Sequence, residues 1–173
     1  MRYASRILLN SNMVQRVAVA VSVPLFILSF FLPAILFRSV KLHESKYLPS
    51  GDMQVYSGSS MAMVSVFGPL SLNFAGVANP LWIAGCALLL ARKSRPARLS
   101  LVLAALLALQ TFQLRIQPLP YDEGEMVQGL LVHPLIGWYT WFTALLLPLV
   151  CSFMPTADPK QKAKAYLSGN PHT

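Results

Sequence analysis

The chain has 173 residues, a net charge of +8, 55% apolar residues and only 12% charged residues. A soluble domain usually carries about 25% charged residues, and the basic residues here stand in clusters between long charge-free runs. This pattern excludes a soluble enzyme core and a disordered chain, and it argues against a nucleic-acid-binding surface. Two cysteines, Cys86 and Cys151, are too few for a disulfide-rich scaffold or a zinc module. We therefore expect a small multi-pass membrane protein.

Four apolar stretches predict membrane spans, because the hydrocarbon core of about 30 Å needs about 20 residues of helix. They predict an all-α fold, namely an integral membrane bundle of four transmembrane helices. The spans are expected near 17–37, 70–91, 99–114 and 134–153. The first run is longer than a signal-peptide core and lacks a small-residue cleavage site, so we expect it to remain uncleaved. The transmembrane domain then covers 17–157, between an N-terminal tail, 1–16, and a basic tail, 158–173.

Lys and Arg residues set the expected orientation of these spans. Ten of the 14 fall in the N-terminal tail, in the connection 92–98 and in the C-terminal tail, and the other four fall in the connections 38–61 and 115–133. The positive-inside rule therefore places both termini in the cytoplasm. We expect the basic clusters to contact anionic lipid at the cytoplasmic face, and we expect no nucleic acid partner.

The dipeptide Asn79-Pro80 interrupts the second predicted span. Asn is a good N-cap and Pro is favoured in the first turn, so a helix can start here. The preferred interpretation is one continuous helix kinked at Pro80, with Gly76 and Ala84 on one closely packed face. The alternative is a true break, with non-helical backbone over 74–79 of the kind that forms binding sites in transporters.

The interiors of the predicted spans contain no Asp, Glu, Lys, Arg or His, which argues against proton relays and ion-coupled carriers. Gln110 and Gln113 share one helix face in the predicted outer half. They are expected either to line a cavity that opens outward or, as we prefer, to hydrogen-bond Asn73 and Asn79 across a helix interface.

Two further groups of residues have predicted structural roles. Ser100, Ala104 and Ala108 form a stripe of small residues that is typical of a helix-packing seam. The aromatic residues at the start of the fourth span indicate an interfacial belt. This predicted belt comprises Trp138, Tyr139 and Trp141.

The sequence contains no recognisable catalytic, cofactor-binding or metal-binding set. His43 and His133 fall in the outer connections near acidic residues, but they lack the spacing of metalloprotease or hydrolase motifs. We therefore expect no enzymatic activity and no cofactor. The same outer connections are expected as loops, with a short interfacial helix near 126–132, and they offer the soluble surface for a partner.

Two short patches, Ala78-Asn79-Pro80-Leu81-Trp82 and Gly137-Trp138-Tyr139-Thr140-Trp141, resemble signatures of small four-span bacterial inner-membrane proteins of unassigned function. The resemblance implies four spans in a bacterial inner (cytoplasmic) membrane, and it implies no catalytic residue. Asn79-Pro80-Leu81 and His133-Pro134-Leu135 also suggest two equivalent hairpins related by an axis along the membrane normal.

From these features we expect a structural or accessory subunit of a membrane assembly. It would pack against a membrane-protein partner, or against itself, through the small faces that contain Gly76 and Ala84 and the stripe of Ser100, Ala104 and Ala108. The alternative function is a small carrier or channel. Its polar path would run past Asn73, Asn79, Gln110 and Gln113.

Overall fold

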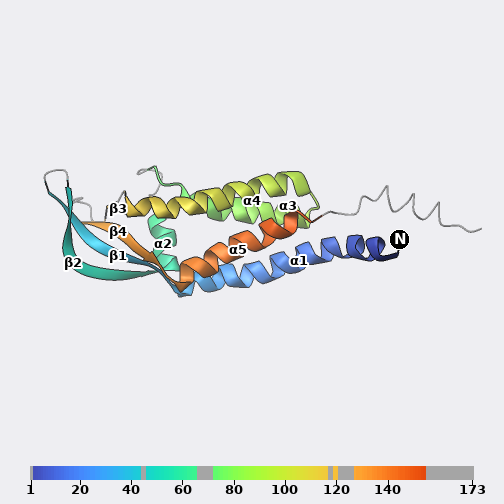
Figure 1. Ribbon diagram of the computed structural model, residues 1–173, viewed down its shortest axis with the longest axis horizontal. Coiled ribbons are helices and arrows are strands. Elements are labelled where there is room, and N and C mark those ends of the chain that lie inside the picture. Colours follow the sequence, from blue (N-terminus) through green and yellow to red (C-terminus); the bar gives the residue numbers. More distant parts are fainter. Residues whose placement is uncertain (1, 44–45, 66–71, 117–118, 121–126, 155–173) are drawn as a thin grey trace, which may run out of the picture.

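The computed structural model describes residues 2–43, 46–65, 72–116, 119–120 and 127–154. Helices α1, α3, α4 and α5 lie side by side at one end of an elongated molecule, and a β-sheet forms the other end (Figure 1). The elements in chain order are α1 (Arg2–Phe31), β1 (Pro33–His43), β2 (Lys46–Ser57), α2 (Gly58–Ser65), the 3-10 turn η2 (Ala75–Val77), α3 (Ala78–Leu90), α4 (Ser94–Leu109), the 3-10 helix η3 (Gln110–Arg115), β3 (Leu119–Pro120), β4 (Val127–Pro134) and α5 (Ile136–Ser152).

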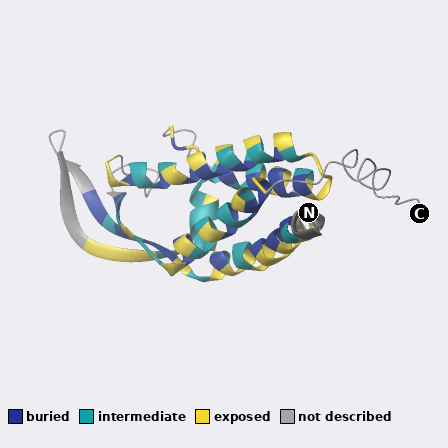
Figure 2. Ribbon diagram, turned by 45° about the vertical axis from the view of Figure 1, so that its right-hand side comes forward, coloured by how far each residue is buried: buried dark blue, intermediate teal, exposed yellow. Residues whose placement is uncertain are grey.

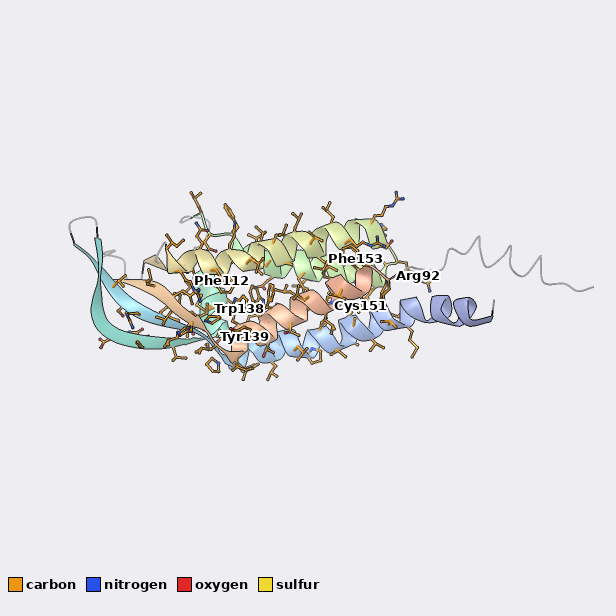
Figure 3. All side chains as sticks on the ribbon, in the orientation of Figure 1. Arg92, Phe112, Trp138, Tyr139, Cys151 and Phe153 are labelled. Atoms are coloured by element: carbon orange, nitrogen blue, oxygen red, sulfur yellow. The ribbon has the colours of Figure 1, made fainter. Side chains whose placement is uncertain are left out.

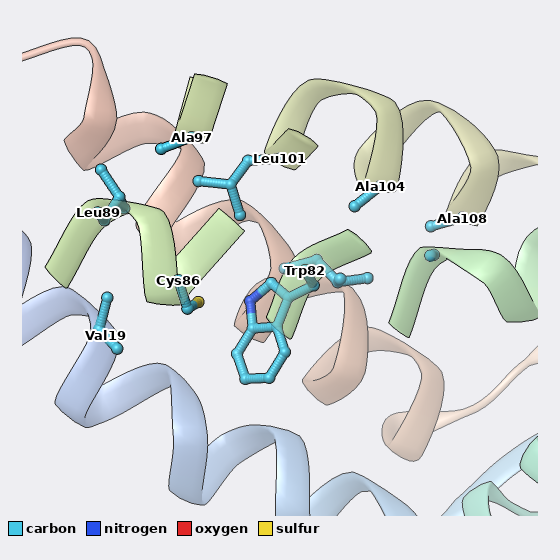
Figure 4. Packing of buried hydrophobic residues seen from close by; sticks show 10 residues of the cluster. Val19, Trp82, Cys86, Leu89, Ala97, Leu101, Ala104 and Ala108 are labelled. Atoms are coloured by element: carbon cyan, nitrogen blue, oxygen red, sulfur yellow. The ribbon is translucent and has the colours of Figure 1, made fainter. Parts of the chain in front are cut away.

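The helices form two pairs, α1 with α5 and α3 with α4, which join in a common core. Stacking of Phe26 on Trp82, with ring centroids 4.4 Å apart, connects α1 to α3. Leu101 and Ala104 of α4 are completely buried against α3 (Figure 4). A Cβ atom on Gly85 would lie only 2.6 Å from Cγ of Leu101, so the α3–α4 contact depends on a residue without a side chain at that point.

Large apolar side chains cover the outside of the helical bundle, while many of its buried residues are small and pack with the larger Trp82, Leu101 and Leu145. Buried and exposed positions alternate along the helices (Figure 2). The buried set includes Ala18, Ser22, Ser29, Ala78, Gly85, Cys86, Ala97, Ala104, Ala108, Ala144, Cys151 and Ser152. The exposed set includes Met13, Val17, Val21, Ile27, Leu28, Ile83, Leu90, Leu99, Leu103, Leu106, Leu109, Ile136 and Val150. Soluble monomers rarely expose such a continuous apolar surface.

The sheet is antiparallel, with strand order β2-β1-β4-β3. Its inner face is apolar and covers the ends of the helices: Ile35, Phe37 and Leu131 are buried together with Leu114 of η3. Phe37 also meets Tyr56 of β2 edge to face, with ring centroids 5.5 Å apart. This second core fixes the sheet on the bundle.

Single residues connect the sheet to two helices. Leu32 alone separates α1 from β1, and Leu135 alone separates β4 from α5. The Leu135 N–H donates to the Ala34 carbonyl over 2.7 Å, and the Gly58 N–H donates to the Leu32 carbonyl over 3.0 Å. A Cβ on Gly137 would lie 2.8 Å from the Leu32 carbonyl oxygen, so this crossing also requires glycine. The antiparallel pair α1–α5 therefore continues directly into the antiparallel pair β1–β4.

The expectation of a mainly helical chain is confirmed, but the all-α class is wrong. Helix α1 stops at Phe31 rather than at residue 37, because a residue that precedes proline avoids the helical conformation and Pro33 begins a strand. The outer connections pair into a sheet instead of forming loops. Residues 127–132 lie in β4, so the expected interfacial helix near 126–132 is also wrong where the structure describes it.

The continuous kinked helix predicted over 70–91 is wrong, because α3 begins at Ala78 and follows η2 directly. The alternative, in which a helix starts at Asn79-Pro80, agrees better with the structure, although α3 starts one residue earlier, at Ala78. Pro80 lies in the first turn of α3, whereas Pro134 is the last residue of β4. The two proline tripeptides are therefore not equivalent, and the suggested duplication fails. Residues 66–71 and the basic tail 158–173 lie outside the described residues.

Among the residues that the structure describes, two helices are long and apolar enough to cross a membrane, Met13–Phe31 and Ser94–Arg115. The second corresponds to the predicted span 99–114 and continues through η3. Two shorter apolar helices, Ala75–Leu90 and Ile136–Ser152, complete the bundle; the latter lies within the predicted span 134–153.

Candidate functional site

The first group of predicted site residues joins the segment before η2 to the end of α4. The backbone N–H of Phe74 donates to Oε1 of Gln110 over 2.8 Å, and Nδ2 of Asn73 donates to the Gln110 carbonyl over 3.3 Å. Oδ1 of Asn73 accepts a further hydrogen bond from the Ala75 N–H over 3.0 Å. Asn73 and Gln110 therefore connect two segments of the chain, as in the preferred interpretation, but Asn73 lies before η2 rather than in a helix and the bonds are to backbone groups.

Asn79 has a different partner from the one expected. Its Oδ1 accepts a 2.8 Å hydrogen bond from Nε1 of Trp141, and Nε1 of Trp82 donates over 3.0 Å to the Ala144 carbonyl. These bonds connect the first turns of α3 to α5. The two patches that carry the family resemblance, 78–82 and 137–141, thus meet in space.

The stripe of small residues on α4 packs inside the chain. Ala104 and Ala108 have no exposed surface, and Oγ of Ser100 donates to the Leu81 carbonyl over 2.6 Å. The predicted packing seam is therefore the α3–α4 interface, so it is not free for a partner. Ala84 is exposed on α3, and the close contact is made by its neighbour Gly85, which sequence reasoning missed. Gly85 stands in the middle of an apolar helix, and a glycine at such a position indicates a close contact with a neighbouring helix.

Only one member of the predicted aromatic belt faces outward. Tyr139 is 52% exposed, whereas Trp138 is 6% exposed and Trp141 is half-buried (Figure 3). The Trp138 ring stacks on Phe142 at 5.0 Å and meets Phe112 edge to face at 5.1 Å. Two of the three aromatic residues therefore build the interior at the junction of helices and sheet.

A cavity of about 80 Å³ lies under α2 at this junction. One wall is the inner face of α2, formed by Gly58, Met61, Ala62 and Ser65, whose spacing is that of successive helical turns. Trp138 lines the cavity from α5. The other walls come from the end of α1, the start of β1, η2, the first turn of α3 and η3.

The polar groups of the cavity are few and uncharged. The hydroxyls of Ser29, Ser65 and Thr111 each donate to a carbonyl three residues earlier, over 2.6–2.8 Å. Nε1 of Trp138, in contrast, is buried without a hydrogen-bond partner in the described part of the chain. Without a charged or acid–base group in its lining, the cavity is suited to holding a small apolar group.

The described residues contain no group of three or more His, Cys, Asp or Glu side chains placed to hold a metal ion. Cys86 and Cys151 are both free and buried in the helical bundle.

Comparison with known proteins adds no assignment to this geometry. No protein-family model, curated protein or solved structure matches the chain. The resemblance to small four-span bacterial membrane proteins therefore stays a prediction. The arrangement of the residues themselves carries the functional argument.

Proposed function

We propose that this chain is an integral membrane protein in which α1, α3, α4 with η3, and α5 cross the bilayer, and that it serves as a structural or accessory subunit of a membrane assembly. The observation that carries the proposal is that large apolar side chains cover the outside of the bundle, while many of the residues at the helix contacts are small. Helices in lipid associate through small residues that let their backbones approach, while large apolar side chains face the hydrocarbon.

The placement of charges supports an orientation with the sheet on the outer side. Arg92 is exposed at the α3–α4 turn, at the end of the molecule opposite the sheet (Figure 3). Lys93, next in the turn, and Arg95, in the first turn of α4, are also exposed. Nε of Arg98 donates to the Ser152 carbonyl over 2.9 Å at the same end of the bundle. The 19 residues Met13–Phe31 rise by about 28 Å as a helix, close to the thickness of a hydrocarbon core. By the positive-inside rule both termini then lie in the cytoplasm of a bacterial inner membrane, against anionic lipid.

Hydrogen bonding favours the accessory function over the carrier or channel. Asn73, Asn79 and Gln110, three of the four residues of the alternative polar path, use their side-chain amides to join segments of the same chain. A conduction path needs polar groups that can exchange partners with a solute. These amides act instead as interhelical contacts.

The outer face of the sheet is the surface we propose for a membrane-protein partner. Met53 and Val55 of β2 are 54% and 60% exposed, and they lie opposite Arg38 and Leu36 of β1. Their neighbours in the strand point to the opposite face, toward the buried Phe37. The face with Met53 and Val55 therefore combines exposed apolar side chains with Arg38, and it is directed away from the bundle.

Co-purification after gentle detergent extraction tests this proposal. A stoichiometric membrane-protein partner should accompany the wild-type chain and should be lost or strongly reduced when Met53 and Val55 are both replaced by Lys. Gln54→Lys is the control for each single change, Met53→Lys and Val55→Lys, because it adds one positive charge to the same strand on the opposite face. Recovery of the wild-type chain alone and monomeric would overturn the accessory function. Solute uptake by the purified chain in liposomes, abolished by Gln110→Leu, would establish the carrier instead.

A further inference from the structure

Arg98 is held in place by two contacts with the last turn of α5. Its Nε donates over 2.9 Å to the carbonyl of Ser152, a residue without exposed surface. Its guanidinium carbon lies 5.5 Å from the centroid of the Phe153 ring, within the range of a cation–π contact. Phe153 lies at the end of the bundle opposite the sheet, as Arg92 does (Figure 3). Within the described chain these contacts engage Nε and the ring face of the guanidinium, and its Nη donors are left for a ligand.

The surroundings of Arg98 are basic. Arg95, one turn earlier on α4, is exposed, and Arg92 and Lys93 are exposed in the turn that precedes this helix. Asp52 is the only Asp or Glu among the described residues, and it lies in β2, in the sheet at the other end of the molecule. Four positive charges therefore stand at this end of the bundle without an acidic partner in the described chain. The planar guanidinium of a fixed arginine is suited to binding two oxygens of a phosphate.

An apolar track continues from Arg95 along α4. Leu99, Leu103 and Leu106 follow Arg95 at intervals of three or four residues, so all four side chains share one face of the helix. All four are exposed, and Leu99 is 64% exposed. A free phosphate ion would use only the arginines at the start of this face. A phospholipid uses the whole face, with its phosphate at the arginines and an acyl chain along the leucines.

We propose that Arg98 and Arg95 bind the phosphate of one phospholipid of the cytoplasmic leaflet, and that an acyl chain of this lipid lies along Leu99, Leu103 and Leu106. The four neighbouring cations favour a head group with a net negative charge, because they repel a head group that also carries an ammonium. The inference deepens the contact with anionic lipid proposed above by assigning it to one site. It rests on the membrane embedding and the orientation proposed there.

Native mass spectrometry of the full chain in detergent tests the inference. The chain is offered equal amounts of phosphatidylglycerol and phosphatidylcholine with identical acyl chains. We expect the first bound lipid to be phosphatidylglycerol by about tenfold, the order of one charge–charge interaction near a protein surface. Arg98→Gln and Arg95→Gln should each lower the affinity for phosphatidylglycerol by about tenfold, as expected for one hydrogen bond to a charged group.

Arg92→Gln is the matched control, because it removes the same charge at the same end of the bundle but outside the proposed site. In physiological salt we expect it to change the affinity by less than about twofold. Arg95 has no hydrogen bond in the described chain, so Arg95→Gln provides the test even where Arg98→Gln unfolds the protein. Circular dichroism confirms the fold of each variant.

Three outcomes would overturn the inference. One is equal affinity for the two lipids in the wild type, and another is a loss with Arg92→Gln as large as with Arg95→Gln, since the basic residues would then act only as diffuse charge. The third is displacement of the lipid by excess inorganic phosphate, which would assign the site to a free ion. Flotation with phosphatidylcholine liposomes tests the embedding separately. A chain that floats but does not prefer phosphatidylglycerol contradicts this site alone, whereas a chain that does not float contradicts the embedding.

Discussion

Nε1 of Trp141 donates a 2.8 Å hydrogen bond to Oδ1 of Asn79, across 62 positions of sequence. The bond joins the first turn of α3 to the first half of α5, and both residues border the cavity under α2. Asn79 is consequently neither the cap of a helix nor a group waiting for a solute. It is a partly buried contact between two helices.

A double-mutant cycle on this pair should show direct coupling. We expect Asn79→Ala and Trp141→Phe each to destabilise the protein, and we expect their combined effect to fall short of the sum by about 0.6–1.7 kcal/mol, as for interhelical hydrogen bonds in lipid. Unfolding in mixed micelles with increasing denaturing detergent gives the free energies. Trp82→Phe combined with Asn79→Ala is the control, because Trp82 donates to a different acceptor. Additive effects of Asn79→Ala and Trp141→Phe would show that the bond contributes nothing.

Two adjacent residues of α3 should respond in opposite ways to added volume. Gly85→Ala should cost about 1–3 kcal/mol, since its new methyl group would overlap the Leu101 side chain and overpack the α3–α4 contact. Ala84→Val adds more volume but faces outward, so we expect a change within about 0.5 kcal/mol. The same unfolding assay compares the two. A larger loss from Ala84→Val than from Gly85→Ala would contradict the packing.

Replacing Pro80 with Ala should change stability little. Pro80 is in the first turn of α3, where backbone N–H groups lack the partners that they have in the middle of a helix, so a proline there costs nothing and its removal gains little. We expect a change within about 0.5 kcal/mol and unaltered helicity by circular dichroism. An increase in helicity on Pro80→Ala would indicate a long helix that the proline interrupts.

Single cysteines should report the orientation of the bundle. In a variant with Cys86 and Cys151 replaced by Ala, Asp52→Cys on the sheet should react with a membrane-impermeant maleimide in intact spheroplasts. Arg95→Cys, at the opposite end, should react only after the membrane is opened; both native residues at these positions are exposed. The reverse pattern would place the sheet in the cytoplasm and would contradict the positive-inside argument.

The helical part of the fold was predictable because apolar length is a local signal. The apolar runs of α4 with η3 and of α5 contain no charged residue. The bounds of the two corresponding predicted spans differ from the observed helix bounds by only a few residues. The sheet was not found, since counting charge-free residues treats Ile35 and Phe37 as further lipid-facing helix. Pro33 and the alternation of these buried residues with the half-buried Leu36 and Arg38 were the local signs of a strand.

The partners of the site residues were harder to predict than their positions. Pairing of β1 with β4 joins residues almost 100 positions apart, as for Ile35 and Pro134, and no local pattern encodes such a register. For the same reason the sequence predicts a hydrogen bond between Asn79 and the glutamines, whereas Oδ1 of Asn79 accepts its hydrogen bond from Trp141. Whether Ala84 or Gly85 contacts α4 depends on which side of α3 faces that helix. Almost all side chains of α3 are apolar, so the hydrophobic pattern of the sequence does not show which side that is.

The single-residue connections at Leu32 and Leu135 give the molecule a mechanical property. Helices α1 and α5 are each joined to a strand by one residue, and those two strands are hydrogen-bonded to each other (Figure 1). In the membrane embedding proposed above, a tilt of the α1–α5 pair moves β1 and β4 with it, because no loop lies between helix and strand to absorb the rotation. A partner bound to the sheet, as proposed, would follow that movement.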